Sequence, residues 1–215
     1  MCFSAQASLM SAIALLIIGI ASIKKAHPHK SLYPFALLPI FFGIQQAFEW
    51  LVWAGFDQNN SDYIYYGSLG FLFFGLIFWP IWMPFCVYNL EHKPKRKQIL
   101  KWLIVVGIVC SLVILYLGCC SFTTLLAQHH VEYTIPGLET HPLLLFLLYV
   151  ASTIIPFFVA TYHLLWIFGL GLFFAFIASI TMFAGTIISL WCFFAAILSI
   201  LVWVIIRNLV QLYYH

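Results

Sequence analysis

The chain has 215 residues, of which 65% are hydrophobic and 7% carry an acidic or basic side chain, and its mean hydropathy is +1.07. Soluble domains carry about 25% charged residues, because polar side chains must cover their surface. This composition excludes a soluble domain, a disordered chain and a small secreted domain held by disulfides. It indicates a polytopic membrane protein with a formal net charge of +3.

Seven apolar runs are long enough for transmembrane helices, each of which needs about 20 apolar residues. None alternates with the two-residue period of a barrel strand. We therefore predict an all-α, polytopic transmembrane helical bundle of seven spans, with residues 1–215 forming a single transmembrane domain. In chain order the predicted spans are Phe3–Ile23, Pro34–Phe56, Ile64–Asn89, Trp102–Leu126, Leu143–Tyr162, Leu165–Thr186 and Ile188–Ile206. Pro80, Pro84 and Pro156 lie inside these spans and are expected to kink them.

The positions of the basic residues predict the orientation. The loops Asp57–Tyr63 and Gln128–Pro142 contain no Lys or Arg. Basic residues in loops lie on the cytoplasmic side, so we expect the N-terminus outside and the C-terminus inside. A six-span chain would place Arg207 outside, and the pattern therefore favours seven spans. The basic residues are Lys24, Lys25, Lys30, Lys93, Lys95, Arg96, Lys97, Lys101 and Arg207.

A polar stretch in the second span is the most informative part of the sequence. Glu49 is the only acid that we place inside a span, where a carboxylate costs about 2.5–3.5 kcal/mol on insertion scales. Gln45 and Gln46 precede it by four and three residues, and Trp53 follows it by four, so all lie on one helix face. Two interpretations remain open: a functional pocket in the outer half of the bilayer, and a protonated or hydrogen-bonded carboxyl that only orders the helices.

Other candidate ligands lie on the predicted outer side. His129, His130 and His141 fall in a loop without Lys or Arg, and Cys2 opens the chain. Histidine and cysteine are ligands that zinc prefers, so these residues are candidates for a metal site. Their spacing matches no zinc signature, and a solvated loop or a disulfide are the structural alternatives.

Three segments resemble an uncharacterised bacterial membrane-protein family whose members open with MCFSA. They are the opening Met1–Ser8, the run Phe42–Gln46 with Glu49 and Trp53, and the run Ser189–Ala196. The resemblance covers the whole chain and implies a multi-pass protein of the bacterial inner (cytoplasmic) membrane, without implying an activity. It gives weight to Cys2, Gln45, Gln46, Glu49 and Trp191.

Several seven-helix functions are testable on the residues. A retinal protein is excluded because the last span lacks a lysine. Hydrolases related to alkaline ceramidases hold zinc with intramembrane histidines, whereas here no predicted span carries a histidine except His163, at a cytoplasmic end. Transporters usually show more intramembrane charge or paired broken helices. Nucleic acid is not an expected partner, since anionic lipid headgroups explain the short basic clusters.

We therefore expect an outer-face polar pocket that binds or senses a small amphiphile or an ion. Its predicted lining is Glu49, Gln45, Gln46, Trp53 and Trp191. The alternatives are an outer-face zinc-dependent intramembrane hydrolase, using Glu49 with His129, His130 or His141, and a small-solute transporter. Cys2 is a further candidate metal ligand. The expected partners are membrane lipids and an unidentified small ligand.

Overall fold

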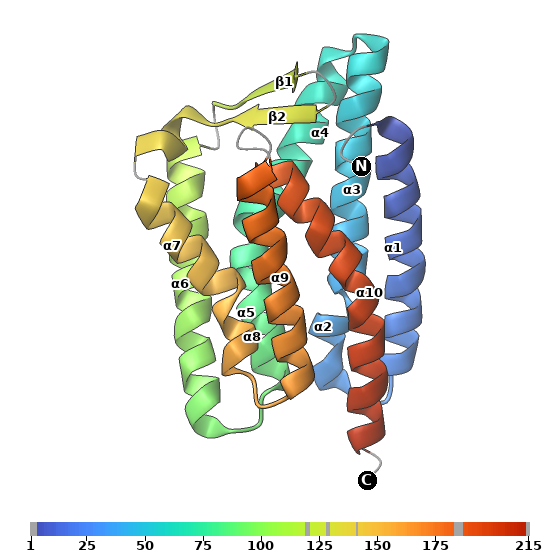
Figure 1. The fold of residues 1–215 in the computed structure, drawn as a ribbon, viewed down its shortest axis with the longest axis vertical. Coiled ribbons are helices and arrows are strands. Elements are labelled where there is room, and N and C mark those ends of the chain that lie inside the picture. Colours follow the sequence, from blue (N-terminus) through green and yellow to red (C-terminus); the bar gives the residue numbers. More distant parts are fainter. Residues whose placement is uncertain (1–3, 119–120, 128–129, 141, 183–186, 214–215) are drawn as a thin grey trace.

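The protein is described by a computed structural model that covers residues 4–118, 121–127, 130–140, 142–182 and 187–213. It is a bundle of helices with a two-stranded hairpin across one end (Figure 1). The first half comprises α1 (Ala5–Ala26), η1 (Lys30–Leu32), α2 (Tyr33–Ala36), α3 (Leu38–Gln58), α4 (Ser61–Leu72), the π-helix η2 (Phe73–Phe78), α5 (Trp79–Leu90) and α6 (Pro94–Gly118). The second half comprises β1 (Thr123–Ala127), β2 (His130–Thr134), η3 (Pro136–Thr140), α7 (Pro142–Thr153), α8 (Ile155–Val159), α9 (His163–Met182) and α10 (Ile187–Tyr213).

The predicted apolar runs form helices, and successive runs point in alternate directions along the bundle (Figure 1). Four helical stretches of the described chain are long and apolar enough to cross a membrane: Ala5–Ala26, Lys30–Gln58, Ser61–Leu90 and Pro94–Gly118. Three shorter apolar helices are Pro142–Thr153, His163–Ser179 and Ala196–Leu212. The mostly helical fold is thus confirmed, and its apolar helices are compatible with a membrane protein.

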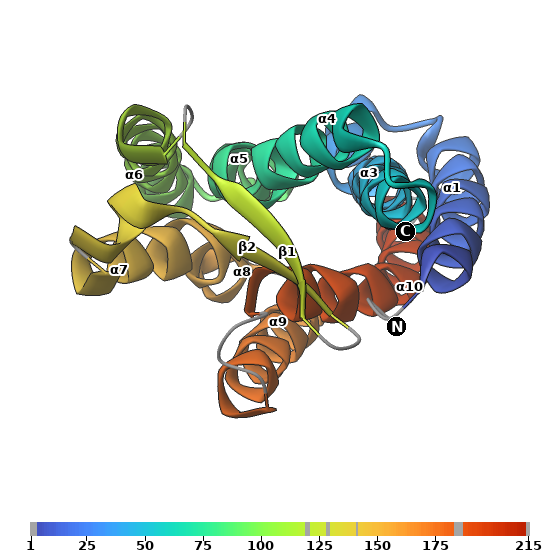
Figure 2. The same cartoon turned by 90° about the horizontal axis from the view of Figure 1, so that it is seen from above.

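The hairpin corrects two sequence predictions. The fourth span was expected to continue to Leu126, but α6 ends at Gly118 and β1 pairs with β2 in an antiparallel register with Leu126 opposite Val131. The following segment, expected to be a solvated loop, includes a strand whose Val131 is fully buried. Val131 is buried against α3, and the two strands pair with each other. These contacts favour a strand over a continued helix, and the β-branched residues Thr123 and Thr124 favour the strand further. Figure 2 shows the hairpin lying across the bundle end.

Two of the three prolines lie at interruptions of the helices, whereas Pro84 lies inside α5, which continues through it. Pro156 lies in the first turn of α8, and the fifth predicted span is therefore two helices, α7 and α8. Pro80 follows the π-helix η2 and lacks the N–H that the π pattern would direct to the carbonyl of Gly75. The Tyr149 hydroxyl donates to that carbonyl instead. A side chain from α7 thus replaces a missing backbone hydrogen bond.

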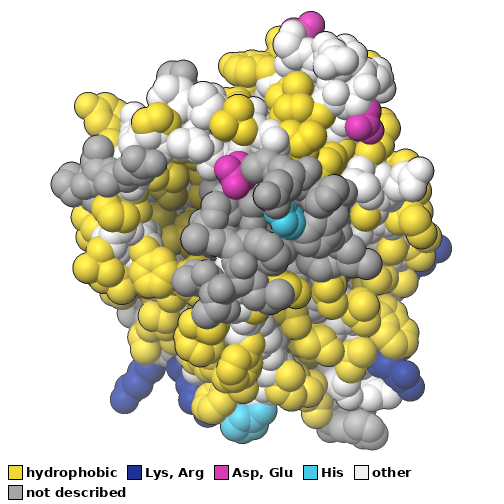
Figure 3. Space-filling view, turned by 45° about the horizontal axis from the view of Figure 1, so that its top comes forward, with side chains coloured by type: hydrophobic (Ala, Val, Ile, Leu, Met, Phe, Trp, Pro, Cys, Tyr) yellow, Lys and Arg dark blue, Asp and Glu magenta, His cyan; other side chains and the backbone are white. Residues whose placement is uncertain are grey.

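Helix α3 lies at the centre of one side of the bundle, packed against α1, α4 and α10. Gly43 permits the close approach of α1, because a Cβ at this position would lie 3.1 Å from the carbonyl oxygen of Ala12. The surface around the helices is largely apolar, and the Lys and Arg side chains visible in Figure 3 lie mostly toward the end opposite the hairpin. An apolar belt with charges at its ends is the surface that a bilayer requires.

Candidate functional site

The four polar or aromatic residues predicted on α3 lie together in the interior. Gln45 and Glu49 are 0% exposed, Gln46 is 1% exposed and Trp53 is 6% exposed. Their spacing of three and four residues places them along one stripe of α3, which faces the neighbouring helices. They form a buried polar cluster, and we call these four residues the α3 cluster.

Gln45 connects the α3 cluster to the broken helix α4–η2–α5. Its Oε1 accepts a hydrogen bond from Trp79 Nε1 at 2.8 Å, and its Nε2 lies 3.5 Å from the carbonyl oxygen of Phe71 as a donor. Trp79 is itself held by stacking on Phe42, with ring centroids 4.0 Å apart. The orientation of Gln45 is therefore determined from both ends of its amide.

Gln46 connects directly to the carboxylate. Its Nε2 donates to Glu49 Oε2 at 3.2 Å. Its Oε1 and the Nε1 of Trp53 are buried without a hydrogen-bond partner among the described residues. Buried polar atoms of this kind cost about 1–3 kcal/mol each when nothing binds them, and native proteins keep few of them.

The hairpin covers the end of the α3 cluster that faces the loops. Val131 of β2 packs with Val52 and Trp53 in one buried group. Tyr133 of the same strand stacks on Phe71 of α4, with ring centroids 5.1 Å apart. The hairpin thus lies between the α3 cluster and the surrounding medium at this end of the bundle.

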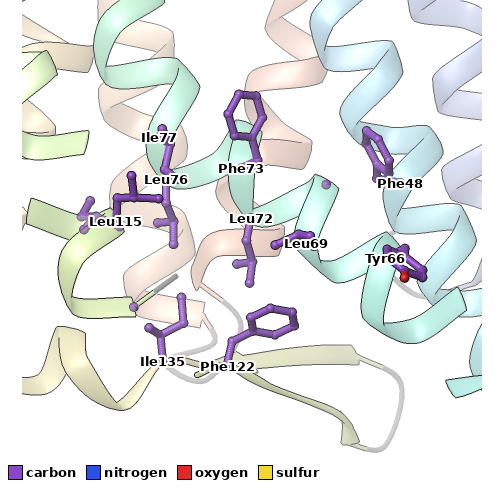
Figure 4. A pocket seen from close by; sticks show the side chains of 13 residues that line it. Phe48, Tyr66, Leu69, Leu72, Phe73, Leu76, Ile77, Leu115, Phe122 and Ile135 are labelled. Atoms are coloured by element: carbon purple, nitrogen blue, oxygen red, sulfur yellow. The ribbon is translucent and has the colours of Figure 1, made fainter. Parts of the chain in front are cut away.

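A separate cavity of about 580 Å³ lies on the other side of α4 (Figure 4). It is bounded by α4, the π-helix η2 and α6, with the hairpin region at one end. Among its described lining residues, all side chains are apolar apart from the Tyr66 hydroxyl. They are Phe48, Tyr66, Leu69, Gly70, Leu72, Phe73, Leu76, Ile77, Ile114, Leu115, Gly118, Phe122 and Ile135.

Helix α4 separates the cavity from the α3 cluster. Phe71 faces the cluster, where its carbonyl accepts from Gln45, while the adjacent Leu72 lines the cavity. Phe48 lies on α3 directly before Glu49 and reaches the cavity past Gly70. A Cβ at Gly70 would lie 2.4 Å from a ring atom of Phe48, so this glycine makes the contact possible.

A family model described as a family of unknown function (DUF6629) matches residues 1–212 of the chain. The chain belongs to this family. No curated protein and no solved structure matches it. The family membership agrees with the expectation of a family without a known activity.

The remaining predicted site residues are dispersed or lie outside the described part of this family member. His130 is the first residue of β2 and is partly buried. Cys2, His129 and His141 lie outside the described residues, as does the side chain of Trp191, which belongs to α10. Among the described residues, no three His, Cys, Asp or Glu side chains group closely enough to hold a metal ion.

One polar centre was missed by the sequence reasoning, at the end of the bundle that carries the basic residues. Glu91, 1% exposed, accepts hydrogen bonds from the backbone N–H groups of His92, Lys93 and Thr161 and from the Thr161 hydroxyl. Burial alone would raise the pKa of the Glu91 carboxyl. The hydrogen bonds lower this pKa by more than burial raises it, so the net pKa lies below its usual range. The sequence signal that could have pointed to this centre is an acidic residue just after an apolar span. Its partner Thr161 lies seventy residues away in the sequence, so the pairing itself was not visible.

Proposed function

We propose that this family member is a bacterial inner-membrane protein that holds the apolar chain of an outer-leaflet amphiphile in the cavity between α4, η2 and α6. The cavity carries the proposal. Its volume, about 580 Å³, lies within the range of small-molecule sites, roughly 300–1,000 Å³. The proposal includes seven membrane passages, with the N-terminus outside and the C-terminus inside. The alternating directions of the apolar segments and the Lys-free and Arg-free outer loops support this topology.

The lining determines the kind of occupant. A buried water needs two to four polar partners, and among the described lining residues the Tyr66 hydroxyl is the one polar side-chain group. An empty cavity would forfeit the dispersion contacts of its lining. Phe73 and Leu115 are among the lining residues and are 47% and 41% exposed, so the cavity opens toward the apolar surroundings of the bundle. A hydrocarbon chain satisfies all three conditions.

The length of the cavity wall matches one leaflet. Tyr66 and Ile77 mark its extent along α4 and η2, and the eleven steps between them, at about 1.5 Å rise each, correspond to roughly 16 Å. The hydrocarbon core of a bilayer is about 30 Å thick, so this wall spans about half of it. Tyr63, Tyr65 and Tyr66 are exposed near the start of α4, as expected of an aromatic belt at the membrane surface. The headgroup of the amphiphile would lie beside these tyrosines.

Photolabelling tests this proposal. The protein is reconstituted with a phosphatidylglycerol whose acyl chain carries a diazirine, and the labelled peptides are identified by mass spectrometry. We expect labelling concentrated between residues 66 and 77 and between residues 114 and 122. Leu115→Trp should fill the cavity and reduce this labelling several-fold. Leu112→Trp is the matched control, because Leu112 is 59% exposed on the same helix but does not line the cavity.

Two results would refute the lipid site. The first is labelling of the exposed face of α1, around Ile13 and Ile17, as strong as that of the cavity wall. The second is equal labelling of the cavity in the Leu115→Trp and Leu112→Trp variants. Topology is tested separately in a variant whose native cysteines are replaced. A cysteine at Asn60 should react with an impermeant maleimide from outside, and one at Lys95 only after permeabilisation; the opposite pattern would reverse the orientation.

A further inference from the structure

We infer that the amphiphile proposed for the cavity carries a primary ammonium in its headgroup, as phosphatidylethanolamine does. Asp62 and the rings of Tyr65 and Tyr66 bind this ammonium. The inference rests on the lipid site proposed above and adds the class of headgroup that this site selects. It concerns the start of α4, at the hairpin end of the cavity (Figure 4).

Two tyrosine rings form an aromatic corner at this end of the cavity. Tyr66 lines the cavity, and the ring of Tyr65 meets it in a T-shaped contact, with ring centroids 5.3 Å apart and the planes at 78°. Tyr65 also stacks on Phe122, another lining residue, at 5.6 Å. Tyr65 and Tyr66 are nevertheless 52% and 60% exposed, so both keep open surface. Aromatic rings attract ammonium groups to their faces, and several rings set at an angle form the cages that bind them.

Asp62 adds a carboxylate to the same face of α4. It precedes Tyr65 by three residues and Tyr66 by four, a spacing that places the Cβ atoms about 5–6 Å apart. Side chains of a helix lean toward its N-terminus, so the two rings lie over the turn that carries Asp62. Asp62 is exposed. Its carboxylate accepts hydrogen bonds from the N–H groups of a primary ammonium, which a quaternary ammonium lacks, and the pair therefore favours ethanolamine over choline.

The charges at this end disfavour an anionic headgroup. Between Lys30 and Lys93 the sequence contains no Lys or Arg, so α3 and α4 carry no basic residue. The backbone N–H groups of Asp62 and Tyr63 donate to Asn60 Oδ1 at 3.0 Å and 3.2 Å, so these amides at the start of α4 are already engaged. Phosphatidylglycerol carries a net negative charge that α3 and α4 do not compensate. Phosphatidylethanolamine has no net charge, and its ammonium is attracted to the acid.

The test compares three photolabile lipids that share one diazirine acyl chain and differ in their headgroup: phosphatidylethanolamine, phosphatidylcholine and phosphatidylglycerol. Each is added in the same trace amount to the full-length protein in phosphatidylcholine bilayers. All three should label residues 66–77 and 114–122, and we expect the ethanolamine lipid to label them several-fold more strongly than the other two. Asp62→Asn should remove this preference without affecting the fold, because Asp62 is exposed. Tyr65→Leu should weaken it. Asp57→Asn is the matched control, because it removes the same charge from an exposed site in the last turn of α3 and should leave the preference unchanged.

Equal labelling of the cavity by the three lipids would overturn the headgroup inference and leave the acyl-chain site in place. Labelling by phosphatidylcholine as strong as that by phosphatidylethanolamine would exclude the hydrogen bond to a primary ammonium. Stronger labelling by phosphatidylglycerol would contradict the charge argument. An ethanolamine preference that persists in Asp62→Asn, or that Asp57→Asn removes equally, would overturn the contact with Asp62. Absence of cavity labelling by all three lipids would instead refute the lipid site itself, and the headgroup inference with it.

Discussion

Replacing Glu91 with Gln tests whether a single charged acceptor holds the basic end of the bundle together. Glu91 Oε1 accepts from the backbone N–H groups of His92 at 2.9 Å and Lys93 at 2.8 Å, and from the Thr161 hydroxyl at 2.8 Å. Its Oε2 accepts from the Thr161 N–H at 2.7 Å. Gln has one acceptor oxygen, so its NH₂ group must face at least one of these donors.

The loss follows from the number of donors and from their burial. Hydrogen bonds to charged groups contribute about 1.5–3 kcal/mol each, and a buried unsatisfied donor costs about 1–3 kcal/mol. Water cannot replace the missing acceptor, because Glu91 is buried. The bonds share one carboxylate and are not additive. We therefore expect Glu91→Gln to lower the free energy of unfolding by about 2–4 kcal/mol.

The pH dependence gives an independent readout. In the folded protein, burial raises the pKa of Glu91 and its hydrogen bonds lower the pKa by a larger amount. The net pKa of folded Glu91 is therefore below its ordinary value. The stabilisation is therefore fully present above the unfolded pKa of about 4.3 and is lost as the pH falls through the folded value. The difference between the native protein and Glu91→Gln should be constant between about pH 6 and 8, and should shrink on acidification below about pH 4.

Circular dichroism during unfolding in detergent measures both effects. Glu132→Gln is the control for the charge change, since it removes a partly exposed acid on β2. The reasoning would be refuted by a Glu91→Gln variant within about 0.5 kcal/mol of the native protein at neutral pH, the range of ordinary surface substitutions. A difference that grew on acidification would refute the sign of the pKa shift.

Two further substitutions test the packing of α5. Gly107→Ala should reduce Tm and yield strongly, because its Cβ would lie 1.9 Å from the Pro80 carbonyl oxygen. Gly171→Ala is the control, since its Cβ meets only the flexible end of the Leu198 side chain, at 2.6 Å. Equal losses of Tm in the two variants would contradict this expectation. Trp79→Phe should cost about 1–3 kcal/mol by leaving the buried Gln45 oxygen without its donor. Trp102→Phe, at an exposed site of α6, is its control, and equal unfolding free energies for the two variants would show that the bond to Gln45 contributes nothing.

The helices were predictable because their signal is local. A bilayer demands about 20 apolar residues per span, and every predicted run contains helix in the structure. The interruption at Pro156 was predictable for the same reason, since a proline removes its own backbone donor. The shared face of Gln45, Gln46 and Glu49 followed from helical periodicity alone.

Other features depended on contacts that are distant in sequence. The stretch from Thr123 to Leu126 is compatible with a continued helix or with a strand, and the packing of Val131 on Trp53 favours the strand that pairs with it. Gln45 pairs with Trp79, thirty-four residues away. The cavity is lined by residues of α4, η2 and α6 together, so the pattern of any one helix does not predict it. Contacts between residues on different helices depend on how the helices are placed relative to one another. Local sequence patterns do not show this placement.

The broken helix α4–η2–α5 shows how these distant contacts combine. Pro80 frees the Gly75 carbonyl for Tyr149 of α7, and Ser111 of α6 donates to the carbonyl of Ile77 at 2.7 Å. In an apolar medium the Gly75 carbonyl, which Pro80 leaves without a backbone donor, needs such a partner, so the proline creates a requirement for a neighbouring helix. The same π-helix supplies Phe73, Leu76 and Ile77 to the cavity wall. Tyr149 and Ser111, which donate to carbonyls of this π-helix, therefore also hold in place the wall against which we propose that the lipid chain packs.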